Sequence, residues 1–336
     1  MKYSRIPQNN AVSNDLEGYA ALREGAAVVD RPDRKILRLS GKDPVGMLNA
    51  ILTNDVPAQV NVGTYAMLLN PKGRVQADLR VVKGEGEILI DTEPEGAEAA
   101  EEILGRYSPF SRVKLEELPD WEILGFYGPD AQSIGAVGLN LAEHESKEVD
   151  NSGIRLLTVG VATPIPGLDH LGPADAVRAI RERLIESGAV PASHEAYETA
   201  RIAAGVPRFG PDITPENFPG ESEHALGRAV NFGKGCYPGQ ETVARMHYRG
   251  SPNKMLHRFE FEPGQAELPE AGDEILQDER ELDGPVSSVD VVGRLTSVAR
   301  IAVDGKVFAL GYLARKADLE APMRAEDAEV LAVTRA

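Results

Sequence analysis

The apolar positions of the N-terminal third follow first a strand period and then a helix period. In residues 34–40, RKILRLS, apolar and polar side chains alternate closely enough to predict a strand. Asp43 and Pro44 then provide the cap and the first-turn residue of a helix. The apolar stripe of this helix consists of Met47, Leu48, Ile51 and Leu52. A mixed α and β unit therefore begins here.

A hairpin follows this helix. Two strand-like runs, residues 65–70 and 73–82, flank the sequence Asn70-Pro71-Lys72-Gly73. Asn in the first, Pro in the second and Gly in the fourth position are the preferences of a type I turn. A further strand over residues 87–92 and a helix over residues 95–107 complete the unit.

A second α+β block is predicted from Trp121 onward. Residues 121–128 and 154–160 are strand-like, and apolar residues recur at helical spacing between Pro173 and Ser187. Another helix is predicted over residues 193–204. The stretch from Gly205 to Gly239 is dense in Gly and Pro with weak periodicity, which predicts a long irregular connection.

The pattern changes again after Met255. Short alternating runs follow, and Asp304-Gly305 between RIAV and KVFALGYL is typical of a two-residue hairpin turn. We therefore expect a C-terminal all-β domain.

Composition and charge narrow the function classes. The 336 residues suffice for two or three domains, and 36 Lys plus Arg against 53 Asp plus Glu give a net charge of -17. This charge repels phosphate backbones, so direct nucleic-acid binding is not expected. A single cysteine, Cys236, can neither close an internal disulfide nor hold a metal by itself, so no metal site is predicted. No signal-peptide core or membrane-length apolar run is present, which favours a cytoplasmic protein without membrane partners.

One segment departs from the acidic background. Residues 228–258 hold six cations and one acid, a formal charge of +5, so the remainder carries -22. We call these six cations the basic island: Arg228, Lys234, Arg245, Arg249, Lys254 and Arg258. The island either binds an anionic ligand or pairs with the acidic surface of a neighbouring domain.

The sequence KGCYPGQE, residues 234–241, lies inside this segment. Gly235 and Gly239 permit close backbone approach and positive φ. Lys234 beside Cys236 could lower the pKa of the thiol and make it reactive. Alternatively, Cys236 is a small buried hydrophobic residue, as free cysteines often are.

GKGCYPGQETVAR, followed by Arg249-Gly250, closely resembles the signature of the YgfZ family, folate-binding proteins related to the aminomethyltransferase (T-protein) of the glycine cleavage system. The resemblance extends to residues 35–56, to the hairpin around residues 68–82 and to residues 197–207. It implies an α+β protein with three domains in a ring and folate in the central hole. The implied domains are residues 1–118 with 193–250, residues 119–192, and a barrel over residues 251–336.

The resemblance also implies site residues. Asp78 matches the carboxylate nearest the reactive folate nitrogens, although the residues alone favour an exposed strand position beside Arg80. Tyr197 matches an aromatic position near the folate, where it could stack on the ligand or pack in the core. Arg201, on the same helical face, could pair with a folate carboxylate or with Glu198.

Residues of the basic segment are expected to contact folate as well, namely Gln240, Arg245 and Arg249. The island would suit the polyglutamate tail of cellular folates. Two positions depart from the family pattern: Ala203 stands where several relatives have a glutamate, and Arg34 replaces an aromatic residue.

The implied function is that of a tetrahydrofolate-binding accessory protein in iron–sulfur cluster assembly or repair, including the clusters of tRNA-modifying enzymes. Its partners would be iron–sulfur client proteins or assembly factors, and Cys236 would supply a transient ligand or a redox thiol. The alternative is a tetrahydrofolate-dependent aminomethyl or methyl transferase with Asp78 as its key carboxylate. Direct tRNA binding through the basic island ranks last because of the acidic remainder.

Overall fold

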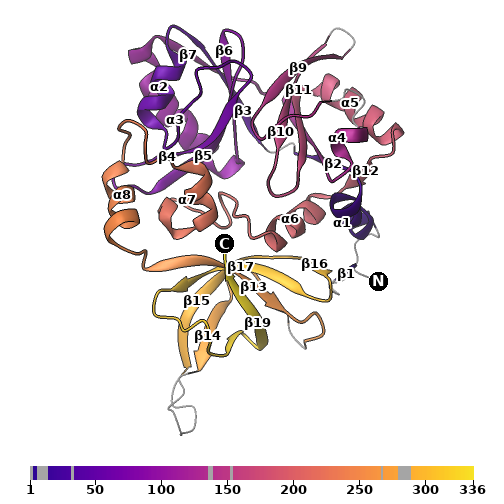
Figure 1. The fold of residues 1–336 in the computed structure, drawn as a ribbon, viewed down its shortest axis with the longest axis vertical. Helices are drawn as coiled ribbons and strands as arrows, with labels where there is room; N and C mark the ends of the chain where they lie inside the picture. Colours follow the sequence, from indigo (N-terminus) through magenta and orange to yellow (C-terminus); the bar gives the residue numbers. More distant parts are fainter. Residues whose placement is uncertain are drawn as a thin grey trace.

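Two mixed α/β units and a β-barrel make up the protein in a computed structural model (Figure 1). The structure describes residues 3–5, 14–31, 34–134, 139–151, 154–265, 268–278 and 289–336. The predicted α+β class with a C-terminal all-β barrel is confirmed.

The first unit is an antiparallel five-stranded sheet in the order β4-β5-β6-β3-β7. Its strands are β3 (Lys35–Gly41), β4 (Gly63–Leu69), β5 (Val75–Lys83), β6 (Glu87–Thr92) and β7 (Val113–Glu117). The predicted β4–β5 hairpin is confirmed, with Gly73 at φ +85° in its turn. Helices α2 (Pro44–Ile51) and α3 (Pro94–Ser111) bury their apolar stripes against one face of this sheet.

The second unit is a six-stranded sheet in the order β12-β2-β8-β11-β10-β9. Its strands are β2 (Ala27–Asp30), β8 (Trp121–Tyr127), β9 (Ser146–Asn151), β10 (Ile154–Val161), β11 (Gly167–Pro173) and β12 (Val190–Ala192). Helix α5 (Ala174–Glu186) covers its outer face, and the short α4 (Ala131–Ile134) packs beside it. Strand β2 thus pairs in the second sheet although it lies early in the chain, and the domain limits stay a prediction.

The inner faces of the two sheets pack against each other. Ile36, Val82 and Leu89 of the first sheet meet apolar residues of β8, β10 and β11. The alternation of β5 decides which of its residues share this face: Ala77 and its i+2 neighbours point to the helices, whereas Asp78 and Arg80 point between the sheets. A carboxylate and a guanidinium are thereby buried at the junction of the two units.

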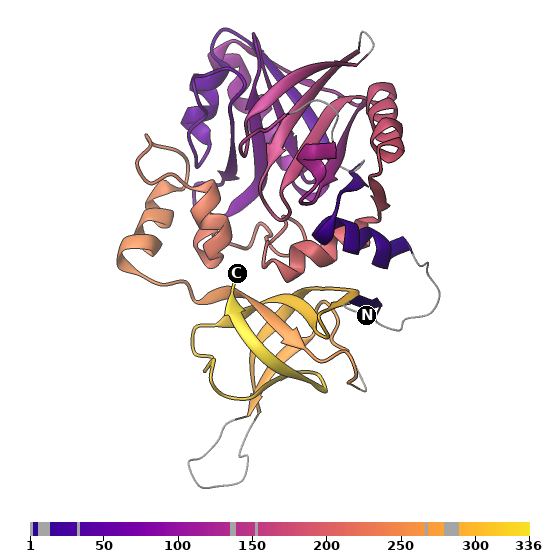
Figure 2. The same ribbon diagram turned by 45° about the vertical axis from the view of Figure 1, so that its right-hand side comes forward.

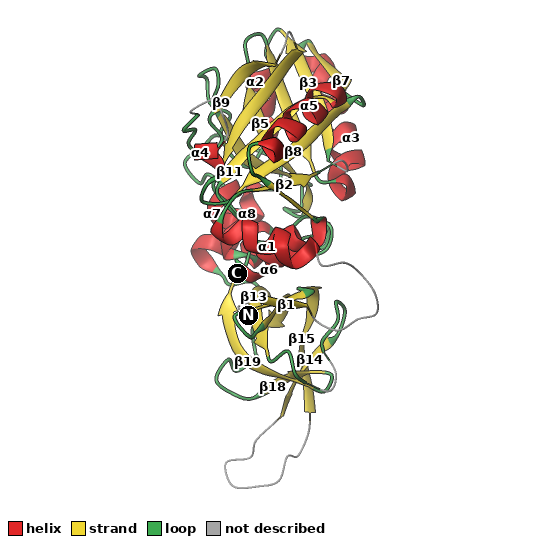
Figure 3. Cartoon of the chain, turned by 90° about the vertical axis from the view of Figure 1, so that its right-hand side faces the viewer, coloured by secondary structure: helices red, strands yellow, loops and turns green. Residues whose placement is uncertain are grey.

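A layer of helices separates the sheets from the barrel (Figure 3). It contains α1 (Asn14–Glu24), α6 (His194–Ala203), α7 (Glu223–Ala229) and α8 (Gln240–Arg249). The prediction of an irregular connection over residues 205–239 was therefore wrong at α7 and at the 3₁₀ turn η1 (Pro219–Glu221). Helix α7 is too short to show a period, and its local signal is the cap Ser222, whose Oγ accepts from the Ala225 N–H at 3.1 Å.

The barrel is closed, in the order β13-β17-β15-β14-β18-β19. Its strands are β13 (Lys254–Phe261), β14 (Glu274–Asp278), β15 (Val289–Val298), β17 (Val307–Ala314), β18 (Met323–Ala325) and β19 (Ala328–Arg335). The predicted Asp304-Gly305 turn is confirmed: both residues have positive φ and join β16 (Ile301–Val303) to β17. Strand β1 (Tyr3–Arg5) pairs with β16, so the start of the described chain lies against the barrel (Figure 2).

Arg201 of α6 links the barrel to α6 and to the residues that follow this helix. Its guanidinium donates to both carboxylate oxygens of Glu198 at 3.0 and 2.7 Å and to Asp212 at 2.6 Å. It also donates to the Val206 carbonyl at 2.9 Å and to Ser297 Oγ of β15 at 3.1 Å. All five of its N–H groups are thus used within the protein, and the side chain is buried.

We expect Arg201→Leu to lower the free energy of unfolding by about 3–5 kcal/mol, because it leaves the buried Asp212 carboxylate unpaired. The matched control is Arg181→Leu, which removes a solvent-exposed pair with Asp30 and should cost less than about 1 kcal/mol. Urea denaturation measures both. Equal losses in the two variants would show that Arg201 does not join the barrel to the rest of the protein.

Candidate functional site

A cavity of about 110 Å³ lies where the two sheets meet α6 and α7, and we call it the central cavity. Its lining is unusually rich in charge for a site between packed sheets. The charged lining residues are Arg31, Arg34, Asp78, Arg80, Glu93, Glu143, Asp169, Arg201, Arg208 and Arg228.

Asp78 is the carboxylate that β5 presents to this cavity. Its side chain is buried, and Oδ2 accepts from the Tyr65 hydroxyl at 2.7 Å. Burial, reinforced by the nearby Glu93 carboxylate, raises the pKa of Asp78 to about 6, against the opposing effect of Arg34. Burial also holds the pKa of Tyr65 well above its usual range, so Tyr65 keeps the proton that it donates. Asp78 can therefore exchange a proton near neutral pH.

Arg80, Arg34 and their acidic partners form a continuous ion-pair network beside Asp78. Arg80 donates to Asp91 at 2.6 Å and pairs with Asp169 of the second sheet. Arg34 donates to the other Asp91 oxygen at 2.7 Å and pairs with Glu93. Although burial opposes ionisation, Arg80 and Arg34 hold the pKa of Asp91 below its usual range. Asp91 therefore stays ionised at a pH at which Asp78 takes up a proton, which separates the two carboxylates chemically.

Tyr197 lies at the wall formed by α6. Its ring stacks on Tyr127 with centroids 5.5 Å apart, and the Arg31 guanidinium lies 4.8 Å above the ring and donates to its hydroxyl at 3.1 Å. The side chain is nearly fully buried. Both predicted uses of Tyr197 remain compatible with this place, because it packs in a core cluster and lines the cavity.

Arg228 of α7 also lines the central cavity. Arg228 pairs with Glu143, its guanidinium lies 5.4 Å from the Tyr65 ring, and it reaches His224 at 3.5 Å. Burial, with Arg80 and Arg228 nearby, lowers the pKa of His144 to about 4, and burial with Arg228 does the same for His224. Both imidazoles are therefore neutral at pH 7.

Three polar atoms around this cavity are buried and lack a hydrogen-bond partner within the described part of the chain: Asp78 Oδ1, His144 Nδ1 and Arg208 Nε. Buried polar atoms are nearly always paired, so three orphans around one cavity indicate that a ligand completes them. Together they offer one anionic acceptor, one imidazole nitrogen and one cationic donor. A flat heterocycle carrying N–H donors and carboxylates fits this set.

The other residues predicted to bind folate lie elsewhere or are engaged. Arg201 lines the cavity, but its donors are all used by the protein, and of the two predicted partners the structure pairs it with Glu198. Gln240, Arg245 and Arg249 belong to α8 and are not among the lining residues that the structure describes. Of the two departures, Arg34 contributes its charge to the network, whereas Ala203 is outside the lining described.

Residues 234–239 of the KGCYPGQE segment form a loop outside the described lining of the central cavity, and we call it the cysteine loop. Lys234 Nζ donates to the carbonyls of Asn49 and Leu52 at 2.8 and 2.6 Å, closing the C-terminal end of α2. Burial lowers the pKa of Lys234. Tyr237 is buried in the cluster beneath β4 and β5, with the Lys234 ammonium 5.0 Å from its ring.

Gly239 completes the anchoring of this loop. It has φ +81°, and a Cβ there would lie 2.6 Å from the Asn70 carbonyl oxygen of the β4–β5 turn. Gly235, by contrast, has open space around its Cα and no positive φ. The loop therefore needs glycine at position 239 for contact with the hairpin.

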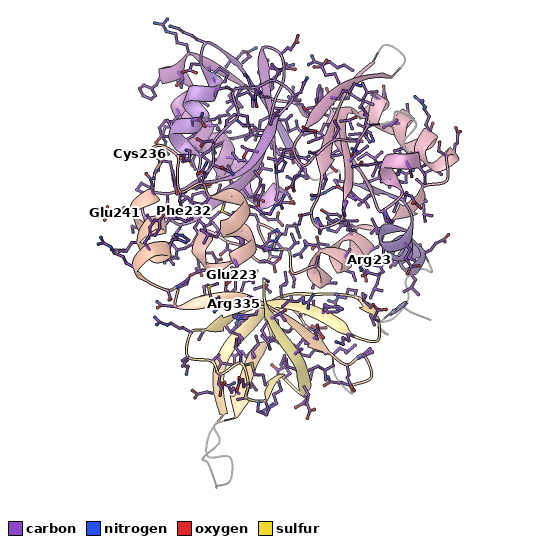
Figure 4. The ribbon with its side chains drawn as sticks, viewed as in Figure 1. Arg23, Glu223, Phe232, Cys236, Glu241 and Arg335 are labelled. Carbon is purple, nitrogen blue, oxygen red and sulfur yellow. The ribbon has the colours of Figure 1, made fainter. Side chains whose placement is uncertain are left out.

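Cys236 is exposed at the outer edge of the protein, on the side of α8 (Figure 4). This rules out the alternative of a buried hydrophobic residue. The anchors on either side, Lys234 and Tyr237, hold the thiol outward. The structure does not bring Cys236 to Asp78: the described lining of the central cavity contains no residue of the cysteine loop.

Three of the six cations of the basic island form ion pairs within the protein, as the interpretation of pairing with acidic neighbours expects. Arg228 pairs with Glu143 and Lys254 with Glu221. Arg258 pairs with Glu260. Only Arg245 and Arg249 are exposed cations of the island for which the described residues provide no ion-pair partner. This leaves little positive surface for a nucleic acid.

Sequence reasoning missed several cavity residues, among them Arg31, Tyr65, Glu93 and Asp169. A signal existed for Asp169, because a charged residue inside the apolar strand GLDHLG is expected to have a buried partner. Arg31 and Glu93 lie at element ends and carry no local pattern. Their roles depend on long-range packing.

Two features are absent from the described part of the chain. No group of three or more His, Cys, Asp or Glu side chains in this part of the chain is arranged to hold a metal ion. None of its helices has the length and apolar character needed to cross a membrane.

The chain resembles known proteins in sequence and in fold. Residues 2–161 match the GCVT N-terminal domain family. The chain is 27% identical over 236 residues to the tRNA-modifying protein YgfZ of Yersinia enterocolitica, covering 68% of this chain and 69% of that protein. It is also 27% identical to the mitochondrial iron–sulfur cluster assembly factor IBA57 homolog of Pyricularia oryzae, a match over 66% of this chain that spans only 54% of that relative's length.

Among solved structures, the glycine cleavage system aminomethyltransferase T of Bartonella henselae has the same fold. The TM-score is 0.74 at 20% identity, over 95% of this chain and 87% of that one.

We expect Asp78→Asn to stabilise the protein at pH 8 by about 2–3 kcal/mol, since it removes a carboxylate that ionises only reluctantly when buried. Because the pKa of Asp78 is raised on folding, the wild type loses stability as pH rises from about 4 to above 6. The advantage of the variant must therefore shrink as pH falls. Thermal denaturation between pH 5 and pH 8 tests this, and a pH-independent difference would contradict the raised pKa.

In the cysteine loop, Lys234→Met should destabilise the protein by about 1–3 kcal/mol, because two carbonyls at the end of α2 lose their donor. Cys236→Ser, at the exposed position between the anchors, should change stability by less than about 0.5 kcal/mol. Chemical denaturation compares the two. A larger loss from Cys236→Ser than from Lys234→Met would show that the thiol is part of the core.

Proposed function

We propose that this chain, which fits the YgfZ family, is a tetrahydrofolate-binding accessory protein in iron–sulfur cluster assembly or repair. Its residues 2–161 match the GCVT N-terminal domain. The observation that carries the folate part is the group of three orphaned polar atoms around the central cavity. The iron–sulfur part is supported by relatives whose names refer to cluster assembly and to tRNA modification.

The residues present fit a reduced pterin. Asp78 Oδ1 would accept from a ring N–H, and the neutral His144 would offer its Nδ1 to a second polar group. With a pKa of about 6, Asp78 can hold or release a proton beside the ligand. Tetrahydrofolate, when bound, would supply nitrogens that carry one-carbon units.

Cys236 would serve the iron–sulfur part of the proposed function. Its exposed, anchored position suits a thiol that meets a macromolecular partner, because a partner can reach it without entering the cavity. One cysteine cannot hold a cluster alone, so the other ligands would come from the client protein or assembly factor. The cytoplasmic location remains a prediction, and one relative named above is mitochondrial.

The second candidate is a tetrahydrofolate-dependent aminomethyl or methyl transferase. Two observations favour it: the T-protein fold, and a proton-exchanging carboxylate in the central cavity. Chemistry confined to that cavity would not require Cys236, which lies outside its lining. The two candidates therefore differ in their dependence on the thiol.

The test combines calorimetric titration with tetrahydrofolate and complementation of cells that lack this chain. We expect Asp78→Asn to weaken binding about tenfold or more through loss of the ionisable acceptor. Cys236→Ser should bind tetrahydrofolate like the wild type and yet fail to restore cluster-enzyme activity. Vigorous tetrahydrofolate-dependent aminomethyl transfer that survives Cys236→Ser would favour the transferase, and absence of tetrahydrofolate binding by the wild type would refute the folate function.

A further inference from the structure

One face of helix α8 is exposed to solvent, and we call it the α8 face. It carries Arg245, Tyr248 and Arg249, and the exposed fraction of Tyr248 is 68%. Val243 of the same helix is buried in the cluster beneath. The described residues provide neither arginine with an ion-pair partner, and Glu241 is the single acid of the helix. An exposed aromatic side chain thus lies beside two arginines that the fold does not use.

Two further rings extend the α8 face. The Phe232 ring stacks on His247 with centroids 4.1 Å apart, and Tyr248 meets the two rings edge to face at 5.7 and 4.7 Å. Phe232 lies four residues before Cys236 in the chain. Figure 4 shows Phe232, Cys236 and Glu241 on the same side of the molecule. The aromatic cluster and the exposed thiol are therefore open to the same partner.

A cavity of about 360 Å³ adjoins the α8 face, between α8 and the barrel, and we call it the α8 groove. His247 belongs to both, since it lines the groove and stacks on Phe232. Much of the remaining lining is apolar, and it includes Met246, Met255, Leu313 and Leu319. Leu319 is 47% exposed, and methionine side chains adapt to the shape of an apolar neighbour. The groove therefore has room for an apolar side chain of another molecule.

The charges around this surface favour an acidic partner. Arg315 lines the α8 groove and, like Arg245 and Arg249, has no ion-pair partner among the described residues. Glu223, the one acid in the described lining of the groove, pairs with Arg335. Three guanidinium groups are thus left for carboxylates of another molecule, which they bind through paired hydrogen bonds.

The same charges favour a protein over a nucleic acid. The net charge of the chain is -17, which repels an extended polyanion wherever it leaves these arginines. An acidic patch on a protein meets only the area that it covers. Tyrosine and arginine are also the residue types that contribute most to protein–protein binding.

A protein seated on α8 also reaches the thiol. The helix has 10 residues, a length of about 15 Å, and Cys236 lies four residues before its first residue. A protein–protein interface of ordinary size covers roughly 800 Å² on each partner, a patch wider than this helix is long. Such an interface centred on α8 therefore includes the cysteine loop.

We infer that the α8 face and the α8 groove together form the docking surface of the protein that meets Cys236. This partner presents carboxylates to the three unpaired arginines and an apolar side chain to the groove beside Leu319. The inference rests on the proposed iron–sulfur function and adds to it the chemistry of the partner's contact surface. It also gives Arg245 and Arg249 a role outside the central cavity.

The test expresses variants in cells that lack this chain and measures the cluster-enzyme activity that each restores. Arg245→Glu combined with Arg249→Glu should lower this activity about tenfold or more, because like charges then face the partner's carboxylates. Leu319→Asp should lower it as well. The matched control is Arg23→Glu with Lys42→Glu, which makes the same charge change at exposed positions outside α8 and should restore wild-type activity. Thermal denaturation checks that each variant is folded.

A second measurement identifies the partner. Tyr248 is replaced by the photoreactive p-benzoylphenylalanine, and the molecule that crosslinks to it in cells is identified by mass spectrometry. We expect an iron–sulfur protein or assembly factor, and loss of the crosslink when Arg245→Glu and Arg249→Glu are added. Changing acidic residues on the contact surface of that protein to lysine should restore activity to the double variant.

Wild-type activity of the Arg245→Glu, Arg249→Glu variant would overturn the inference, while loss of activity in Cys236→Ser would leave the proposed iron–sulfur function standing. A crosslink to RNA, or to a second copy of this chain, would overturn it as well. Full activity of both Cys236→Ser and the double variant would refute the iron–sulfur function and this inference with it.

Discussion

The guanidinium of Arg80 holds the two α/β units together and shapes the space between them. It comes from the inner face of β5, binds Asp91 of the neighbouring strand and reaches Asp169 of the other sheet. A buried arginine with two carboxylates fixes the relative position of the sheets far more narrowly than apolar packing does, because its donors have fixed directions. Asp78, two residues earlier on the same face of β5, points into the same space.

That arrangement also explains why the partners of Asp78 differ from those of the neighbouring acids. Asp91, Glu93 and Asp169 each have a guanidinium partner, whereas Asp78 has a tyrosine hydroxyl and one oxygen for which the described residues provide no hydrogen-bond partner. The network thus uses the nearby cations and leaves one carboxylate whose protonation a ligand can control. The cysteine loop is held by contacts rather than by an ion-pair network. Lys234, Tyr237 and Gly239 are fixed against α2 and the β4–β5 hairpin, and the Cys236 thiol faces outward. The central cavity and the cysteine loop are thus two separate places on the protein.

Local sequence rules predicted much of the fold but not the residues that line the central cavity. The β4–β5 turn, helix α5 and the Asp304-Gly305 hairpin depend on neighbouring residues, so their patterns were sufficient. Helix α7 was missed because seven residues show no period. Asp78 and Tyr197 entered through family resemblance. Arg31, Glu93 and Arg208 did not, since only the packing of β2, β6 and the residues after α6 brings them together.

The most direct test of the central claim, that folate chemistry and thiol chemistry occupy separate places, is a crystal structure of the protein soaked with tetrahydrofolate. We expect the pterin in the central cavity with a ring nitrogen within hydrogen-bond distance of Asp78 Oδ1, and Cys236 still exposed to solvent. A pterin bound against the cysteine loop, or a ligand contact to Cys236, would contradict the separation.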